Sequence, residues 1–280
     1  MQIIQKRKWF YIISLLVIIP GLISLFVQGL NLGIDFKGGS ILNVRIEESV
    51  QAADVRAALK EFNLSNAEVQ KSGAEFYIRT IELNQEQSNE LQSALKDKFG
   101  QVEFLSAESV GAAIGNELTR SALLALFIAT LLMLVYITFR FEWSFGVAAI
   151  IPIIHNVLIV IGLFSIFQWE IGSSFIAAIL TVVGYSINDT IIIFDRVREN
   201  MRLKLKEDRE TLLNKSIMQT LNRTINTVLT STFVLIALLL FGGTTIKIFI
   251  MAMLIGFVSG AYSSIFIASP IWYEIKSRAS

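Results

Sequence analysis

The 280-residue sequence contains no cysteine and a single histidine, His155. Disulfides, thiol catalysis and zinc–thiolate centres are therefore excluded, and a histidine-rich metal site cannot form. Charged residues are also scarce, at 17%, whereas 54% of the residues are hydrophobic and the mean hydropathy is +0.61. Soluble domains usually carry about 25% charged residues. The composition therefore predicts an integral membrane protein.

Motifs of nucleotide-using and hydrolytic enzymes are missing too. The chain has no phosphate-binding G-x-x-x-x-G-K-[ST] loop, no G-x-S-x-G turn and no H-E-x-x-H motif. We therefore expect a protein that is not an enzyme, binds no metal and uses no cofactor. Any work that it performs must come from an ion gradient or a partner. A membrane potential supplies about 2.3 kcal/mol per charge per 100 mV.

Six apolar segments are long enough to cross a bilayer, which takes about 20 residues. They are residues 9–28, 121–139, 143–168, 171–194, 224–241 and 248–273. Lys and Arg gather at the N-terminus, in residues 195–223 and at the C-terminus, whereas the short loops of the opposite side contain only Lys247. This bias predicts that both termini are cytoplasmic.

The polar insertion at residues 30–116 has the pattern of a small domain. Alternating apolar residues predict strands at 40–47, 67–72, 74–81 and 101–109, and helical spacing predicts helices at 50–62 and 84–100. The order βαββαβ is that of an α+β ferredoxin-like domain. We therefore predict an α-helical polytopic membrane protein. Its parts are a first span in 1–29, an extracytoplasmic domain in 30–116 and the remaining five spans in 117–280.

The charged segment 195–223 has its own periodicity. Apolar residues recur at multiples of four, namely Val197, Met201, Leu205, Leu213, Ile217 and Leu221, with Lys and Arg on the other faces. This pattern predicts an amphipathic helix that lies along the cytoplasmic surface of the membrane. The helix would serve either as a basic topology anchor or as a docking face for a cytosolic partner.

Asp189 is the residue that the apolar pattern explains least, because it lies within the fourth span. A rise of 1.5 Å per residue places it about 10 Å inside a cytoplasmic boundary at Arg196. Intramembrane carboxylates usually face the bundle interior and often lie on proton or ion pathways, but a structural pair with another helix fits equally well. Arg223, near the start of the fifth span, is the basic partner to test. The alternative is that Arg223 extends to the cytoplasmic surface.

Other polar residues lie close to these two in sequence. They are Ser186 and Asn188 on the fourth span, and Asn222, Asn226 and Thr230 on the fifth. They could face a bundle interior and conduct protons through waters, or join helices by hydrogen bonds worth about 0.6 kcal/mol each. In the third span, His155 is followed by Asn156. A lone intramembrane histidine is expected to be a neutral, hydrogen-bonded residue rather than a ligand.

Five motifs resemble the SecD/SecF family of translocase subunits, and they occur in the order that the SecF members have. They are "LGIDFKGGS" (32–40), "SVGAAIGNELTRSAL" (109–123), "VGYSINDTIIIFDRVREN" (183–200), "TLNRTINTVLTS" (220–231) and "FGG" (241–243). The first contains the family residues Gly33, Asp35, Phe36, Lys37, Gly38 and Gly39. The resemblance covers essentially the whole chain. It relates the chain to the RND transporter superfamily.

The resemblance implies a function and partners. SecF pairs with SecD in the bacterial inner membrane, giving twelve spans, and the pair associates with the SecYEG channel. It helps a translocating polypeptide across by using the proton-motive force. Asp189 would be the proton-pathway carboxylate and Arg223 its basic neighbour. Membrane lipid is a further expected partner, and nucleic acid is not expected to bind.

Two other functions remain open from the residues alone. One is half of an RND-type small-molecule exporter, and the other is a non-transporting scaffold that stabilises the translocon. The chain also departs from the family pattern in two places. Asn156 stands where the family often has Asp, which puts a proton role of the third span in doubt, and Ala112 stands where the family often has Pro.

Overall fold

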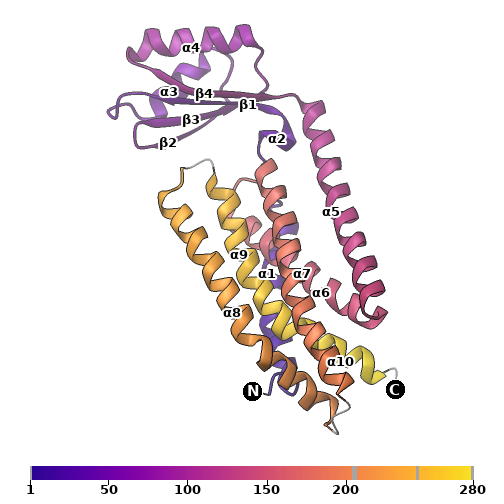
Figure 1. The fold of residues 1–280 in the computed structure, drawn as a ribbon. Helices are drawn as coiled ribbons and strands as arrows, with labels where there is room; N and C mark the ends of the chain where they lie inside the picture. The colour runs from indigo at the N-terminus through magenta and orange to yellow at the C-terminus, as the bar shows by residue number, and fades with distance from the viewer. Residues whose placement is uncertain (1, 204–206, 244–245, 279–280) are drawn as a thin grey trace. The chain divides into compact units, whose positions relative to one another are not determined.

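The computed structural model describes residues 2–203, 207–243 and 246–278, which form two compact units (Figure 1). One unit comprises Met1–Asn31 and Leu123–Ser280, and the other comprises Leu32–Ala122. The prediction ended the inserted domain at residue 116, before the observed boundary. The difference arises because helix α5 (Ala112–Arg140) is continuous and begins within the second unit.

The first unit is a bundle of long helices. They are α1 (Arg7–Val27), α5, α6 (Trp143–Phe167), α7 (Ser173–Arg202), α8 (Arg209–Phe241) and α9 (Lys247–Ser263). A π-helical segment, η2 (Ser264–Ala268), joins α9 to α10 (Ser269–Arg278), so that Lys247–Arg278 forms one span. In the part of the chain that the structure describes, six helical segments are long and apolar enough to cross a membrane. The prediction of six such segments is confirmed, and the chain is a multi-pass membrane protein.

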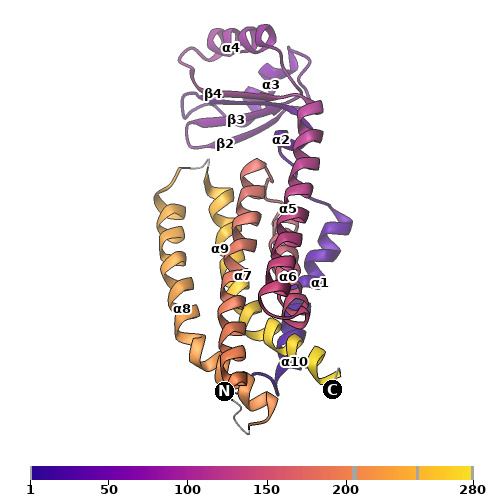
Figure 2. The same cartoon turned by 45° about the vertical axis from the view of Figure 1, so that its right-hand side comes forward.

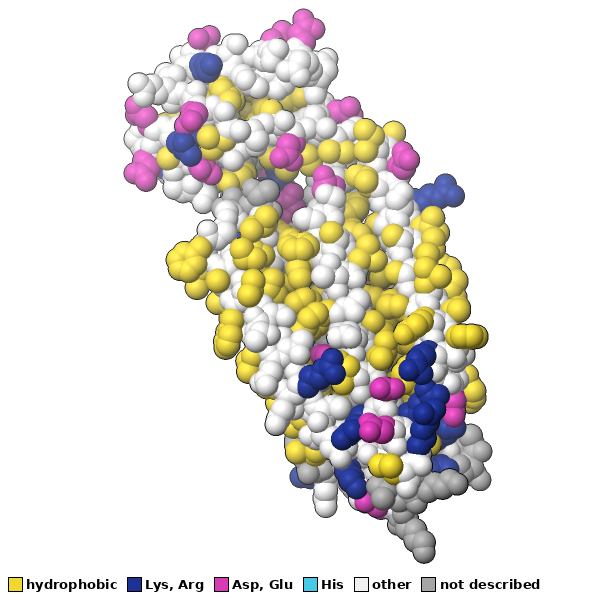
Figure 3. All heavy atoms as spheres, in the orientation of Figure 1, with side chains coloured by type: hydrophobic (Ala, Val, Ile, Leu, Met, Phe, Trp, Pro, Cys, Tyr) yellow, Lys and Arg dark blue, Asp and Glu magenta, His cyan; other side chains and the backbone are white. Residues whose placement is uncertain are grey.

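The helices differ in how much of their apolar surface they bury. Within the most apolar stretch of each, 56% of α6, 50% of α7 and 50% of Lys247–Arg278 is buried, against 11% of α1, 6% of α5 and 11% of α8. Figure 2 shows α7, α8 and α9 running side by side, and α7 packs against α6, α8 and α9. Hydrophobic side chains cover much of the visible face of this unit (Figure 3). A surface of this kind suits contact with lipid rather than water.

Helices α1 and α6 approach each other closely through two glycines. A Cβ atom on Gly162 would lie 2.9 Å from the Cα of Gly21, and one on Gly21 would lie 2.8 Å from the Cα of Gly162. Near the same ends of the helices, Ser24 Oγ and Ser165 Oγ are 2.7 Å apart, and Ser165 Oγ donates to Gly29 O at 2.7 Å. Small residues and hydroxyls are the usual means by which membrane helices pack, because lipid provides no hydrophobic force between them.

The prediction of a separate surface helix at 195–223 is wrong. Helix α7 continues to Arg202, and α8 begins at Arg209, so the segment consists of the ends of two long helices. Val197, Leu213 and Ile217 are buried. Their spacing therefore reflects packing between helices, a requirement that gives the same periodicity as a membrane surface. Leu205, part of the same pattern, lies outside the described residues.

The start of α8 has a local cause. Asp208 precedes the helix, and its side chain accepts a hydrogen bond from the backbone N–H of Thr211 at 3.1 Å. Such a cap satisfies one of the donors that the first helical turn leaves free. Hydrogen bonds from the side chain and backbone of Thr211 hold the pKa of Asp208 below its usual range.

The second unit contains a four-stranded antiparallel sheet in the order β2-β3-β1-β4. Its elements are α2 (Ile34–Lys37), β1 (Gly39–Arg45), α3 (Ala52–Lys60), β2 (Glu68–Ser72), β3 (Glu75–Thr80), α4 (Gln85–Phe99) and β4 (Glu103–Val110). Each predicted strand and helix is present with its ends shifted by a few residues, and α2 was not predicted. The core lies between the sheet and α3 and α4, where Leu59, Leu95, Leu42 and Phe76 are buried together.

The glycine contact between α1 and α6 leads to a prediction about stability. We expect Gly162→Ala to lower the free energy of unfolding by about 1–3 kcal/mol, because the new methyl group overpacks the contact with Gly21. Gly184→Ala is the matched control, since Gly184 is also helical and a Cβ atom there meets nothing within 4 Å. Thermal unfolding in detergent compares the two variants. Equal stability of both would show that the glycine contact does not determine the packing.

Candidate functional site

Asp189 lies on α7 and is buried, with 1% of its surface exposed. Its Oδ2 atom has no hydrogen-bond partner among the residues that the structure describes. A buried charge without a partner is costly, and such groups in native proteins are commonly functional. The structure therefore places the predicted carboxylate inside the bundle but provides no partner within hydrogen-bond distance.

Arg223 lies on α8, the helix next to α7, and is exposed in this chain. Within 2–203, 207–243 and 246–278, no ion pair joins it to Asp189 at 4.0 Å or less, so the simplest form of the predicted pair is absent. Arg223 is nevertheless close enough to attract the Asp189 carboxylate electrostatically. The pair is therefore arranged for a longer-range attraction rather than a direct contact.

The predicted polar companions divide into two sets. Ser186 is buried on α7, whereas Asn188 on α7 and Asn222, Asn226 and Thr230 on α8 are all exposed. The hydroxyl of Thr230 donates within its own helix, to Asn226 O at 2.9 Å and Thr227 O at 3.0 Å. In this chain alone, the α8 stripe of Asn222, Asn226 and Thr230 is therefore exposed rather than buried among the described helices. Most of these residues form an outward-facing polar surface on an apolar helix.

A cavity of about 400 Å³ lies next to Arg223, between the end of α5 and the facing parts of α7 and α8. Its lining residues are Tyr136, Arg140, Phe141, Ile191, Ile192, Asp195, Arg196, Glu199, Gln219, Thr220 and Arg223. Figure 3 shows Lys and Arg gathered near this end of the helical unit, with acidic side chains between them. The lining therefore carries charged groups of both signs.

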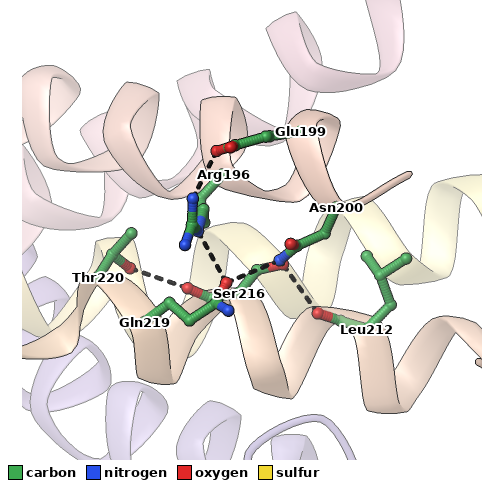
Figure 4. A network of polar contacts seen from close by, with 7 residues as sticks. All are labelled: Arg196, Glu199, Asn200, Leu212, Ser216, Gln219 and Thr220. Carbon is green, nitrogen blue, oxygen red and sulfur yellow. Dashed lines mark hydrogen bonds and ion pairs between the residues drawn. The ribbon is translucent and has the colours of Figure 1, made fainter. Parts of the chain in front are cut away.

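A polar network joins the end of α7 to the beginning of α8 (Figure 4). Asn200 Nδ2 donates to Ser216 Oγ at 2.8 Å and to Gln219 Oε1 at 2.9 Å, and Arg196 Nε donates to the same Gln219 atom at 2.7 Å. Asn200 and Ser216 are buried. This network fixes the register of the helices that carry Asp189 and Arg223. The sequence pattern did not predict this network, although Asn200 and Ser216 fall on the apolar face of the 195–223 pattern.

A second polar cluster crosses the bundle between α1, α6 and α7. His155 lies with Nε2 at 2.9 Å from Ser14 Oγ and Nδ1 at 3.1 Å from Asn156 Oδ1, and Asn156 Nδ2 donates to Ser186 Oγ at 2.7 Å. All of these residues are buried. His155 is hydrogen-bonded on both ring nitrogens, as expected for an intramembrane histidine that is not a ligand.

The π-helical segment η2 meets α7 beside Asp189. Ser264 Oγ lies 2.9 Å from Thr190 Oγ1 and donates to Ser186 O at 3.2 Å. Short π-helical segments inside α-helices occur frequently at functional sites. Among the described residues, no group of three or more His, Asp or Glu side chains could hold a metal ion.

The family residues of the "LGIDFKGGS" motif form a tight junction within the second unit. Gly33 precedes α2, which contains Asp35, Phe36 and Lys37, and Gly38 and Gly39 follow with positive φ angles of 75° and 136°. A Cβ atom would lie 2.8 Å from Ala112 Cα at Gly38 and 2.6 Å from Thr80 O at Gly39. Gly38 is needed for close backbone packing against the start of α5 and Gly39 for packing against the end of β3, which is a structural role.

Comparisons with known proteins agree on one family. The family described as protein export membrane protein SecD/SecF, C-terminal, matches residues 90–278, and the SecD/SecF GG motif matches residues 23–50. The protein translocase subunit SecF of Thermobaculum terrenum is 42% identical, over 96% of this chain and 92% of the relative. The protein translocase subunit SecDF of Bacillus subtilis is 38% identical, over 98% of this chain but 38% of the relative.

A solved structure is similar over the whole chain. The crystal structure of SecDF, a translocon-associated membrane protein from Thermus thermophilus, has a TM-score of 0.91 and 36% sequence identity. The match covers 99% of this chain and 39% of the SecDF chain. The chain therefore spans well under half of that solved protein, although it covers almost the full length of separate SecF relatives such as the one from Thermobaculum terrenum.

The unpaired carboxylate leads to a second prediction. We expect Asp189→Asn to raise the free energy of unfolding by about 1 kcal/mol, because a neutral amide is less costly to bury than an unpaired carboxylate. Asp195→Asn, at an exposed carboxylate on the same helix, should change stability little. Thermal unfolding of both variants in detergent measures the effect. A loss of stability confined to Asp189→Asn would instead identify Asp189 as part of a stabilising pair.

Proposed function

Because the chain belongs to the SecD/SecF family of protein export membrane proteins, we propose that it is the SecF half of a proton-driven translocation machine. The pair with SecD would use the proton-motive force to assist a polypeptide across the membrane beside the SecYEG channel. The observation that carries this proposal is Asp189, a buried carboxylate with an unpaired oxygen in a chain without a nucleotide-binding motif. Protons are the only coupled species in the proposal, with no enzymatic chemistry and no bound cofactor.

The outward-facing polar surface supports a partner within the membrane. Arg223, Asn222, Asn226 and Thr230 are exposed on α8. A charged side chain in contact with hydrocarbon costs several kcal/mol, about 2.5–3.5 kcal/mol on insertion scales. We propose that the transmembrane part of SecD covers this surface. The fused SecDF relatives, of which this chain spans 38% and 39%, fit a missing half of that kind.

The proposed cycle uses the attraction between Asp189 and Arg223. When Asp189 is ionised, Arg223 attracts it across the α7–α8 contact, and when Asp189 takes up a proton the attraction is largely lost. The network of Asn200, Ser216 and Gln219 holds the two helices together at one end. Loss of the attraction would therefore let the helices separate around Asp189 while that end stays fixed. Such a movement is a small rearrangement between two packed states.

The movement would reach the second unit through α1 and α5, which lead into it. We propose that this unit is a ferredoxin-like domain on the extracytoplasmic side, with both termini in the cytoplasm and the chain in the bacterial inner membrane. Its strand order β2-β3-β1-β4 supports this fold. Cavities in this unit are lined by charged residues such as Glu61, Lys98 and Arg45, which suits a polypeptide better than an apolar exported compound.

Proton flux in vesicles tests this proposal. In the complex with SecD and SecYEG, we expect Asp189→Asn and Arg223→Met to reduce gradient-driven export and proton flux to the level of vesicles without the pair. Arg202→Met, at an exposed residue near the end of α7, is the control and should keep wild-type flux. Full export by Asp189→Asn would disprove coupling through this residue. Loss of assembly in both variants, with no proton flux in the wild type, would favour a scaffold.

A further inference from the structure

We propose that Ser186 is a positioning residue for Asp189, and that a directed hydrogen-bond chain from α1 holds its hydroxyl in place. The chain runs from Ser14 through His155 and Asn156 to Ser186. Its role in coupling rests on the proposed function, but its effect on the protonation of Asp189 does not.

The amide of Asn156 fixes the direction of the chain. Because Asn156 Nδ2 donates to Ser186 Oγ, its Oδ1 atom faces His155 and must accept. His155 Nδ1 therefore carries the proton of the neutral imidazole, and Nε2 is an acceptor 2.9 Å from Ser14 Oγ. The single Ser14 hydroxyl proton is shared between this nitrogen and Tyr262 OH, which lies farther away at 3.4 Å. The donors of His155 and Asn156 thus both point towards α7.

At the end of this hydrogen-bond chain, Ser186 has a free hydroxyl proton and Asp189 has a carboxylate oxygen without a donor. Ser186 Oγ accepts from Asn156, and no acceptor for its own hydroxyl proton occurs among the described residues. Asp189 Oδ2 is buried, and no described residue donates a hydrogen bond to it. The residues are three positions apart on one helix, so they lie on the same face. The Ser186 hydroxyl proton can therefore reach the carboxylate through one bridging water while Oγ still accepts from Asn156.

Ser186 is held on two further sides. Ser264 Oγ donates to its backbone oxygen at 3.2 Å, and a Cβ atom built on Gly260 would lie 3.2 Å from the Ser186 Cβ atom. A side chain at position 260 would therefore crowd Ser186. The serine is therefore fixed by α6 on one side and by α9 and η2 on the other.

This series of hydrogen bonds cannot itself conduct protons. The amide of Asn156 does not accept a proton on its oxygen and release another from its nitrogen. Its effect is to orient a donor. A hydrogen bond donated to the ionised form of a carboxylate favours that form. The other titratable groups facing Asp189 are Arg223 of α8 and Tyr185 of α7, while α6 contributes His155 through the chain and α9 contributes Tyr262 beside Ser14.

Because the hydrogen-bond chain begins at Ser14 on α1, it also connects Asp189 to that helix. Ser14 lies on the helix that leads into the second unit, and Tyr262 OH donates to Phe10 O of the same helix at 2.7 Å. A change in the protonation of Asp189 changes what Ser186 can donate to, and hence the hydrogen bonds of Asn156 and His155. Under the proposed function, this gives Asp189 a direct link to α1 in addition to its attraction to Arg223.

Infrared titration of the full chain with its partner tests the proposal. The carbonyl band of protonated Asp189, identified by its absence in Asp189→Asn, gives the pH at half-protonation. We expect Ser186→Ala to move this midpoint upward by about one pH unit, the shift that corresponds to loss of one hydrogen bond to a charged group. Asn156→Leu should move it in the same direction by less, and Ser186→Thr, which keeps the hydroxyl, should restore it.

Ser144→Ala is the matched control, because Ser144 is also buried on the helix of Asn156 but outside the chain. Its midpoint should equal that of the wild type. If Ser186→Ala and Asn156→Leu fold and leave the midpoint unchanged, the chain only joins helices and the proposal is overturned. If Ser186→Ala does not fold, Asn156→Leu decides by the same criterion. A shifted midpoint without proton flux in the wild type would keep this inference and disprove the proposed function.

Discussion

The burial of Asp189 without a partner is the constraint on which the rest of the helical unit depends. A carboxylate at this position lowers stability in the absence of a compensating charge or donor. Two groups could compensate: Arg223, which acts at a distance, and the hydroxyl of Ser186, which is held by α6 and η2. Under the proposed function, this balance would leave both protonation states of Asp189 accessible, as coupling to a proton gradient requires.

The same constraint explains why the polar residues divide into an inner and an outer set. Ser14, His155, Asn156 and Ser186 satisfy one another inside the bundle. Asn222 and Asn226 are exposed on α8, and Arg223, also exposed, lines the cavity between α5, α7 and α8. We therefore infer that Asp189 lies between a completed interior and an interface that a second subunit completes. Under the proposed function, protonation of Asp189 would be sensitive to changes on both sides.

The apolar runs were enough to predict the membrane helices, because burial in lipid requires length and composition only. The strands of the second unit were likewise predictable from alternation, as at Leu42 and Val44. The direction of a helix face was not predictable, because Asn226 and Ser186 are both polar residues in apolar helices and only the position of the neighbouring helices distinguishes them. The hydrogen bond between Ser14 and His155 joins residues 141 positions apart, beyond any local periodicity. For the same reason, the spacing of Val197 and Ile217 was attributed to a membrane surface rather than to helix packing.

The central claim is that Asp189 takes up and releases a proton in the assembled protein. Potentiometric titration of the purified complex with SecD counts the bound protons directly, and the difference between wild type and Asp189→Asn isolates this residue. The account predicts that the wild type takes up about one more proton per complex than the variant as the pH is lowered. Titration curves that coincide over the whole pH range would contradict it.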